Sequence, residues 1–154
     1  MSPPPELRDG ELLLRPWRDE DAAAIGVGPG DDGAVGRYFG RPFDGAAPAP
    51  DPEAPSFAIV EDGRLVGRIW FAPGKRPFEV GYFLHPDAWG RGLATRSLVL
   101  VRDWMNQPLE LCTHPKNARS QRVAERAGFL RAGEVENYAR FKDGETTAVR
   151  YVWP

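Results

Sequence analysis

The chain has 154 residues, of which 42% are hydrophobic and 27% are charged, a composition typical of a globular protein with one core. Its formal net charge of −2 gives no general attraction to nucleic acid or to an anionic membrane surface. The single cysteine, Cys112, excludes an intramolecular disulfide and cannot form a zinc cluster by itself, so we expect no metal site. No segment approaches the roughly 18 apolar residues of a membrane helix, and the Pro-rich start lacks a signal-peptide core, so we expect a cytoplasmic protein.

The first third of the chain predicts a strand, a short helix and a long loop. Residues 11–17 (ELLLRPW) are an apolar run of strand length, and the acidic residues at 19–21 are typical of the start of a helix, here through Ile25. Residues 26–55 contain seven glycines and six prolines, so we expect a loop with only a helical turn or two at 34–41. A loop of this length in a compact domain is usually a lid, a binding loop or disordered.

The rest of the chain predicts six strands and two helices. The strands are expected at 56–60, 65–71, 78–84, 109–113, 129–141 and 146–153, and the helices at 91–105 and from the capping residue Asn117 to Ala127. Asp-Gly pairs at 62–63 and 143–144 are strong hairpin signals. The strand–helix–strand unit from 78 to 113 predicts two parallel strands joined by a right-handed crossover. Ligands bind beyond the carboxyl ends of such strands, which is where the turn at 84–95 lies.

That turn carries a glycine-bearing segment, Trp89-Gly90-Arg91-Gly92-Leu93-Ala94, at the beginning of the helix. A helix opening exposes unpaired backbone N–H groups and the positive end of the helix dipole, and glycines let an anion approach the backbone closely. Arg91 and Arg96 add positive charge. We therefore expect a phosphorylated small molecule here. The segment matches neither the dinucleotide fingerprint, which needs a third glycine where Thr95 stands, nor the P-loop.

Four segments carry a resemblance to a known family. In chain order they are LLLRPWRDEDAAAI, FAIVEDGRLVGRIWF, EVGYFLHPDAWGRGLATRSL and HPKNARSQRVAERAGFLRAGE. Together they resemble the GNAT N-acetyltransferase superfamily and, within it, the RimJ/RimL branch of ribosomal-protein-alanine N-acetyltransferases, over about the whole chain. The resemblance implies one GNAT-like α/β (α+β) domain over 1–154. Its mixed, mostly antiparallel sheet would have about seven strands, a splayed parallel pair at the cofactor site, and helices on both faces.

The resemblance also implies acetyl-CoA as co-substrate and names the residues that would hold it. The family's pyrophosphate motif falls on Trp89–Ala94, where Trp89 replaces the usual Arg or Gln, as is familiar in this branch. The backbone N–H groups that would hold the pyrophosphate belong to Gly90, Arg91, Gly92, Leu93, Ala94 and Thr95. The strand end Phe83-Leu84-His85 would pair its backbone with the pantetheine arm and polarise the thioester carbonyl. Asn117 matches the asparagine that contacts this arm.

Two residues are candidates for proton transfer. An attacking amine must be neutral, and Glu79, on the strand that enters the cofactor site, is the candidate base, since this branch often has an acid there. Ser120 matches the family's serine near the sulfur and is the candidate proton donor to the leaving thiolate. The alternatives are structural roles: an exposed strand glutamate at 79 and a small packing residue at 120. His85 is a rival base, because histidine titrates near neutral pH.

Other side chains receive weaker assignments. Cys112 and His114 share a strand face, but the family implies direct transfer, so we expect no covalent catalysis. Tyr82 and the tryptophans at 17, 70 and 104 are expected in the core. In the branch, two helices before FAIVEDG form a wall of the acceptor site, and here the second is largely replaced by DGAAPAPDPEAPS. This leaves Arg37, Tyr38 and Phe39 as candidate acceptor contacts.

The sequence therefore predicts an acetyl-CoA-dependent N-acetyltransferase acting on a primary amine, with a protein or peptide α-amine suggested by the branch. Two alternatives stay open: transfer to a small molecule such as an antibiotic, polyamine or amino-acid analogue, and a non-catalytic acyl-CoA-binding module. The expected partners are acetyl-CoA and an amine acceptor, without nucleic acid or membrane. The sequence leaves the oligomeric state open, a homodimer included.

Overall fold

One eight-stranded sheet organises the computed structural model, which describes residues 4–24, 54–72, 74, 76–139, 141 and 143–154. Its strands are β1 (Leu7–Asp9), β2 (Leu12–Pro16), β3 (Ser56–Glu61), β4 (Arg64–Phe71), β5 (Phe78–Leu84), β6 (Leu109–Thr113), β7 (Leu130–Val135) and β8 (Ala148–Trp153). The helices are α1 (Asp21–Ala24), the 3₁₀ turn η1 (Pro86–Ala88), α2 (Leu93–Met105) and α3 (Ala118–Arg126). The candidate acceptor contacts Arg37, Tyr38 and Phe39 lie outside the described residues.

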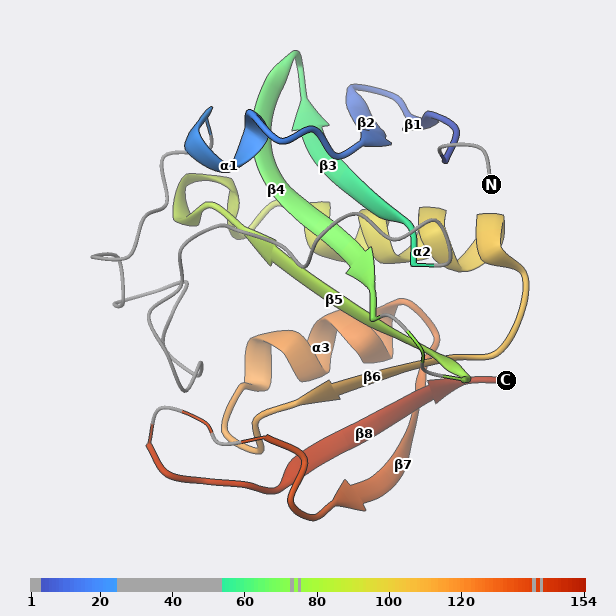
Figure 1. Ribbon diagram of the computed structural model, residues 1–154, viewed down its shortest axis with the longest axis vertical. Coiled ribbons are helices and arrows are strands. Elements are labelled where there is room, and N and C mark those ends of the chain that lie inside the picture. Colours follow the sequence, from blue (N-terminus) through green and yellow to red (C-terminus); the bar gives the residue numbers. More distant parts are fainter. Residues whose placement is uncertain (1–3, 25–53, 73, 75, 140, 142) are drawn as a thin grey trace.

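The strand order is β1-β2-β3-β4-β5-β6-β8-β7, and every neighbouring pair is antiparallel except β5–β6. This confirms the predicted mixed, mostly antiparallel sheet with one parallel pair (Figure 1). The additional edge strand is β1, which pairs with β2 through a turn at Gly10. Three residues, two of them exposed, are too few to show a strand period in the sequence.

The predicted hairpin between β3 and β4 forms where the Asp-Gly pair stands. Asp62 and Gly63 both have positive φ values, 49° and 78°. Two consecutive residues of this kind match the right-handed twist of the flanking strands, and aspartate and glycine are the residues that tolerate this conformation. Local turn chemistry therefore decides this part of the sheet.

The helices lie on both sides of the sheet, with α1 in front of the upper strands and α2 behind them (Figure 1). The buried face of α2 carries Leu93, Leu98 and Val101, while Trp104 and Met105 pack against the core from its last turn. α2 also contacts α3 and the first two strands. None of the helices formed by the described residues has the length and apolarity needed to cross a membrane.

β5 and β6 pair only at their beginnings. Their register joins Phe78 to Leu109 and Glu79 to Glu110, and extends no further. Beyond these two pairs the strands diverge toward their carboxyl ends, as Figure 1 shows. The predicted splayed pair therefore opens a space between two strands whose backbone groups would otherwise bond to each other.

The closing hairpin differs from the prediction of strands at 129–141 and 146–153. β7 ends at Val135 and β8 begins at Ala148, so the strands are shorter than expected. The connection turns inward instead, because Tyr138 and Phe141 are aromatic side chains that lie in the cleft described below rather than in solvent. The Asp-Gly pair still makes a turn, with Gly144 at φ 90°.

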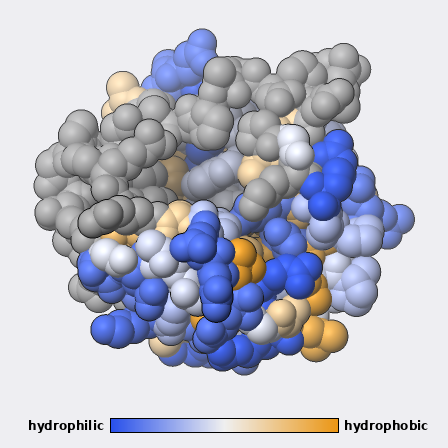
Figure 2. Space-filling view, turned by 60° about the horizontal axis from the view of Figure 1, so that its bottom comes forward, coloured by the Kyte–Doolittle hydropathy of each residue, from blue (hydrophilic) through white to orange (hydrophobic). Residues whose placement is uncertain are grey.

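Figure 2 shows the surface on the side of this hairpin. Hydrophilic side chains cover most of its lower part, and hydrophobic ones appear only in small patches. Among the described residues, Leu130 on β7 is the large hydrophobic side chain that stands out as exposed, at 62%.

Candidate active site

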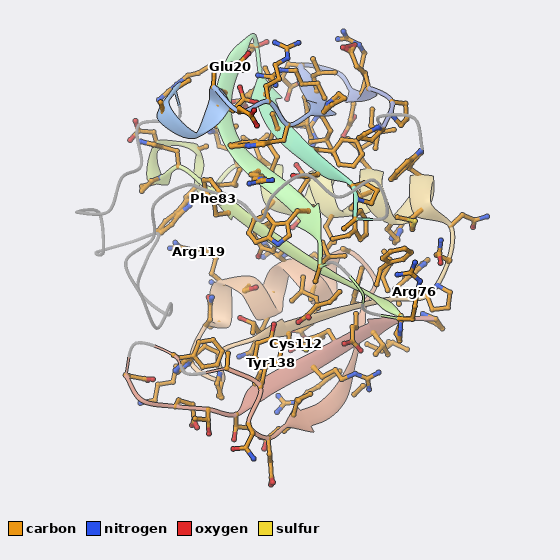
Figure 3. The ribbon with its side chains drawn as sticks, in the orientation of Figure 1. Glu20, Arg76, Phe83, Cys112, Arg119 and Tyr138 are labelled. Atoms are coloured by element: carbon orange, nitrogen blue, oxygen red, sulfur yellow. The ribbon has the colours of Figure 1, made fainter. Side chains whose placement is uncertain are left out.

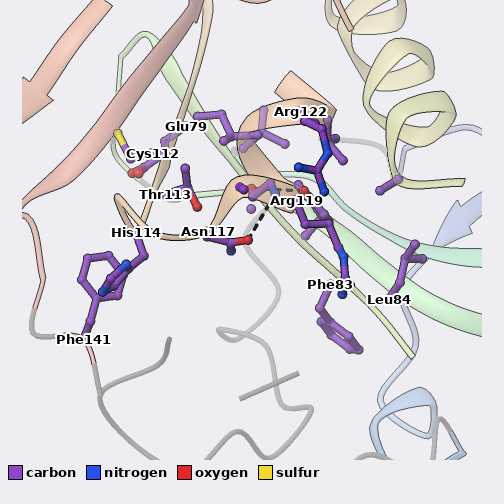
Figure 4. A pocket seen from close by; sticks show the side chains of 18 of the residues that line it. Glu79, Phe83, Leu84, Cys112, Thr113, His114, Asn117, Arg119, Arg122 and Phe141 are labelled. Atoms are coloured by element: carbon purple, nitrogen blue, oxygen red, sulfur yellow. Dashed lines mark hydrogen bonds between the residues drawn. The ribbon is translucent and has the colours of Figure 1, made fainter. Parts of the chain in front are cut away.

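A cleft of about 640 Å³ lies where β5 and β6 diverge. Figure 4 shows its two sides, with Cys112, Thr113 and His114 on one and Phe83 and Leu84 on the other. The start of α2, the first turns of α3 and the β7–β8 connection complete the walls. They contribute, among others, Trp89, Ala94, Asn117, Arg119, Ser120, Arg122, Tyr138 and Phe141.

At the start of α2 the backbone is arranged for an anion. Gly92 is the N-cap residue with φ 75°, and its own position offers no side chain to cap the helix. A Cβ added at Gly90 or Gly92 would meet none of the described residues within 4 Å, so these residues leave the space above both glycines open. The first turn of α2 also lacks acidic residues. The N–H groups at 93–95 therefore face an open space at the positive end of the helix dipole.

The side chains of Arg91 and Arg96 form ion pairs with carboxylates of the N-terminal half of the chain. Arg91 lies 2.5 Å from Glu61, at the end of β3. Arg96 contacts Asp9 at 2.8 Å and Glu11 at 2.7 Å. These ion pairs tie the start of α2 to the N-terminal strands. The expectation that both side chains add charge to an anion site finds no support in this geometry, although the backbone of Arg91 stays in the turn.

Instead, α3 supplies arginines to the cleft. The guanidinium of Arg119 lies over the indole of Trp89, 3.8 Å from the ring centroid, and Arg122 follows one turn later. The indole is held in turn, because Trp89 Nε1 donates to Leu84 O at 2.9 Å. Figure 3 shows Arg119 close to Phe83 at one side of the molecule. Trp89 stands where the family usually has Arg or Gln, and the stacked Arg119 brings a positive charge to that place.

The backbone of β5 presents one edge to the cleft. His85 N–H donates to Val66 O at 2.7 Å, and antiparallel strands alternate, so the backbone of Phe83 also faces β4. By the same alternation the N–H groups of Tyr82 and Leu84 face the side where β6 has diverged. Of the three residues expected to pair with the pantetheine arm, only Leu84 has its backbone on this side. The side chain of Phe83 lines the cleft.

Glu79 is buried, with 7% exposure, which excludes the interpretation as an exposed strand residue. Tyr138 Oη donates a hydrogen bond to Glu79 Oε1 from the β7–β8 connection. Burial, followed by the charge and hydrogen bond of Glu79, raises the pKa of Tyr138 well above its ordinary value, so the phenol keeps its proton. Figure 3 shows Tyr138 beside Cys112. Sequence reasoning missed Tyr138, which lies in an irregular segment without a motif.

Ser120 lies in the first turn of α3 and is held by two residues. Its N–H donates to Asn117 Oδ1 at 3.2 Å, which confirms Asn117 as the helix cap. Its Oγ accepts a hydrogen bond from Tyr82 Oη at 3.1 Å. All three residues line the cleft. Tyr82 packs against the core as expected, but its hydroxyl reaches the candidate site.

His114 anchors the β7–β8 connection. Lys116 N–H donates to His114 Nδ1 at 3.0 Å, so the proton of this imidazole is on Nε2, which lies 2.8 Å from Asp143 Oδ2. The Asp143 pKa is lowered by the N–H of Glu145 and by this imidazole, despite some opposing burial. With both ring nitrogens engaged, His114 positions the hairpin beside the cleft.

The remaining candidates are more distant from the cleft. His85 Nδ1 accepts from Asp87 N–H at 3.2 Å and caps η1, and the side chain is not part of the cleft lining, so the geometry does not favour it as a base. Leu93 is 1% exposed, which leaves its backbone as the only part that can face a ligand. Among the described residues, no group of three or more His, Cys, Asp or Glu could hold a metal ion.

The sequence matches the family model of the Acetyltransferase (GNAT) domain over residues 11–130. The chain belongs to the GNAT acetyltransferase family. The predicted family resemblance is thereby confirmed. No curated protein shows significant similarity to the chain.

Solved structures similar to this GNAT chain include ribosomal-protein acetyltransferases. RimL, the ribosomal L7/L12 alpha-N-protein acetyltransferase in complex with coenzyme A, has 14% identity, a TM-score of 0.83 and 97% coverage of both chains. Mycobacterium smegmatis RimJ in complex with CoA-disulfide has 19% identity and a TM-score of 0.78, covering 97% of this chain and 85% of its own. The microcin C7 self-immunity acetyltransferase MccE, in complex with acetyl-CoA and AMP, has 14% identity and a TM-score of 0.78, covering 94% of this chain and 93% of its own. At these identities the likeness concerns the fold.

Proposed function

We propose that this GNAT protein transfers the acetyl group of acetyl-CoA directly to a primary amine, and that the acceptor is a peptide or protein N-terminal α-amine. One observation carries the proposal. An uncapped helix N-terminus, a buried carboxylate at Glu79 and a hydroxyl at Ser120 border the same cleft between two diverging strands. An anion site, a proton acceptor and a proton donor are the groups that acyl transfer from a phosphorylated thioester requires.

The cleft fits an extended phosphorylated thioester, which supplies an activated acetyl group when bound. The N–H groups of the first turn of α2 would hold the pyrophosphate, and Arg119 of α3, stacked on Trp89, would add a positive charge. The outward N–H groups of Tyr82 and Leu84 would pair with the amides of the pantetheine arm, as an added strand does. The open space at Gly90 and Gly92 supports this pose, because a Cβ there would stand in it.

Glu79 is our candidate base. It would accept the proton of the acceptor ammonium, directly or through water, so that the amine gains a lone pair for attack. The hydrogen bond from Tyr138 holds Oε1 in place. Ser120 is our candidate proton donor to the sulfur. Aromatic side chains, Phe141 among them, also line the cleft.

The acceptor assignment is supported by the structural likeness to RimL, whose name describes acetylation of a ribosomal protein at its α-amine. The likeness to MccE supports a second candidate, a small-molecule amine. Arg37, Tyr38 and Phe39 remain our candidate acceptor contacts. In either case Glu79 and Ser120 would transfer the protons, and only the amine that receives the acetyl group would differ.

The test is acetyl-CoA-dependent thiol release with two panels, peptides with free N-termini and small amines including polyamines and amino-acid analogues. We expect turnover with peptides and none with N-terminally blocked peptides. Turnover only with small amines would support the second candidate. Tight acetyl-CoA binding without turnover on either panel would indicate a binding module, and failure to bind coenzyme A would refute all of these functions.

The role of Glu79 has its own test. Glu79→Gln removes the proton acceptor at constant size, so we expect kcat to fall about 100-fold with unchanged affinity for coenzyme A. Glu134→Gln, at an exposed position of β7, is the matched control and is expected to keep wild-type kcat. Unchanged turnover of the Glu79 variant would remove it as the base.

A further inference from the structure

Tyr82 and Ser120 form a hydrogen-bonded pair in the lining of the cleft. Tyr82 comes from β5 and Ser120 from the first turn of α3, 38 positions later, and Tyr82 Oη donates to Ser120 Oγ at 3.1 Å. Both residues line the cleft. Nothing in the family motifs used above assigns a role to this tyrosine, and its position on an apolar strand predicts only packing.

The pair orients the serine proton. A hydroxyl has one proton and two lone pairs. Because one lone pair of Ser120 Oγ receives the Tyr82 proton, the proton of Ser120 itself points away from Tyr82. The backbone of Ser120 is fixed at the same time, through the bond from its N–H to Asn117 Oδ1. We propose that Tyr82 is a positioning residue that acts through Ser120, directing the serine proton toward the departing sulfur and replacing that proton as it leaves.

This role rests on the proposed transfer, and its protons and electrons balance. Glu79 first takes one proton from the acceptor ammonium and releases it to solvent. The neutral amine nitrogen then forms the new C–N bond and gives its second proton to Glu79, while the electron pair of the broken C–S bond goes to sulfur. Ser120 Oγ–H gives its proton to the sulfur while Tyr82 Oη–H moves to Ser120 Oγ. Solvent then returns one proton to Tyr82 and takes one from Glu79, so both side chains end as they began.

The surroundings of Tyr82 suit a donor that keeps its proton until it is needed. Burial raises the pKa of Tyr82 to about 12, against smaller opposing contributions from the Ser120 hydrogen bond and the charge of Arg119. At neutral pH the phenol is therefore protonated. A phenoxide is a weaker base than a serine alkoxide, so passing the charge from Ser120 to Tyr82 makes proton donation by the serine less unfavourable.

The test is a double-mutant cycle on thiol release, with Tyr82→Phe, Ser120→Ala and the double variant. Tyr82→Phe removes only the hydroxyl. We expect kcat to fall about ten-fold for Tyr82→Phe and about 100-fold for Ser120→Ala, with KM for acetyl-CoA unchanged in both. Because the tyrosine acts through the serine, the double variant is expected to match Ser120→Ala. Losses that multiply would overturn the proposal.

Two further measurements distinguish positioning from packing. Tyr151→Phe removes a hydroxyl from another buried tyrosine, on β8 and outside the cleft, and is expected to keep wild-type kcat. In single turnovers in H₂O/D₂O mixtures, the coupled transfers from Ser120 and Tyr82 give a curved dependence of rate on deuterium fraction, and Tyr82→Phe is expected to reduce this curvature. A loss of thermal stability in Tyr82→Phe with unchanged kcat would instead show a packing role.

The outcomes separate this inference from the function on which it rests. If the wild-type protein releases no thiol with any amine, the proposed function fails. If the wild type is active and Tyr82→Phe keeps its kcat and its curved isotope dependence, only the positioning role of Tyr82 fails.

Discussion

The substitution Gly92→Asp tests the anion site at the start of α2 without disturbing the fold. Gly92 is the N-cap residue at φ 75°, and a Cβ there meets no atom of the described part of the chain within 4 Å. A left-handed conformation costs most non-glycine residues about 1–2 kcal/mol, and aspartate tolerates it better than most. A negative charge at the helix start gains about 0.3–1 kcal/mol from the helix dipole. Side-chain capping adds nothing here, because it uses an extended backbone and Gly92 is left-handed. We therefore expect the stability of folding to change by less than about 1 kcal/mol, or roughly 4 °C in Tm.

The affinity for coenzyme A is expected to change far more. A carboxylate at Gly92 would compete with the pyrophosphate for the N–H groups of α2 and would repel it. A hydrogen bond to a charged group contributes about 1.5–3 kcal/mol. Loss of two such bonds costs about 3–6 kcal/mol, which corresponds to a roughly 10²- to 10⁴-fold rise in Kd.

Isothermal titration calorimetry with coenzyme A measures this effect, and Gly63→Asp is the matched control. Gly63 has nearly the same backbone conformation, φ 78°, and equally open space, but it lies in the β3–β4 turn. We expect the control to bind coenzyme A like the wild type. A Kd for Gly92→Asp within three-fold of the wild-type value, in a protein that remains folded, would refute the assignment of the anion site.

Three further predictions follow from contacts in the structure. Tyr138→Phe removes the hydrogen bond to Glu79 and is expected to lower kcat, measured by thiol release, while coenzyme A affinity stays constant. Arg119→Gln is expected to raise the Kd for coenzyme A about ten-fold by removing a charge-assisted contact, whereas Arg126→Gln, in the last turn of α3, leaves it unchanged in the same titration. Burial opposes the ionised form of Asp21, but its partner Arg15 and the N–H of Arg18 lower its pKa in the folded protein. The ionised carboxylate therefore stabilises the folded state at pH values above the pKa of the unfolded chain. This stabilisation is lost as the pH falls through the lower pKa of the folded state. Asp21→Asn is expected to reduce stability at neutral pH by about 3 kcal/mol and to flatten the acid limb of a stability–pH curve.

Several features of the fold and site could be predicted because neighbouring residues decide them. Asp62-Gly63 specifies its turn through backbone preferences that need no distant partner. The same is true of Asn117, whose side chain caps its own helix. The glycines at 90 and 92 mark an open helix start, and the β5–α2–β6 order predicts a parallel pair. The family motifs extend along the chain in the same way and predict the GNAT fold.

Other features depend on contacts between segments far apart in the chain. Glu79 and Tyr138 are 59 positions apart, and neither residue type nor local period indicates that the connection between β7 and β8 turns inward to join them. Arg96 has the local context of an anion ligand, yet the N-terminal strands bring two carboxylates to it. A side chain that could bind a ligand binds instead to whichever charged group folding places beside it.

Local patterns along the chain thus account for most strands of the sheet, the Asn117 cap and the open start of α2, because backbone propensities and turn chemistry act over a few residues. Only the tertiary structure brings Tyr138 to the candidate base Glu79 and Tyr82 to the candidate acid Ser120. It also brings Arg119 to Trp89. These pairs exist only where strands and helices from different parts of the chain meet, since hydrogen bonds and cation–π contacts require distances of a few ångströms.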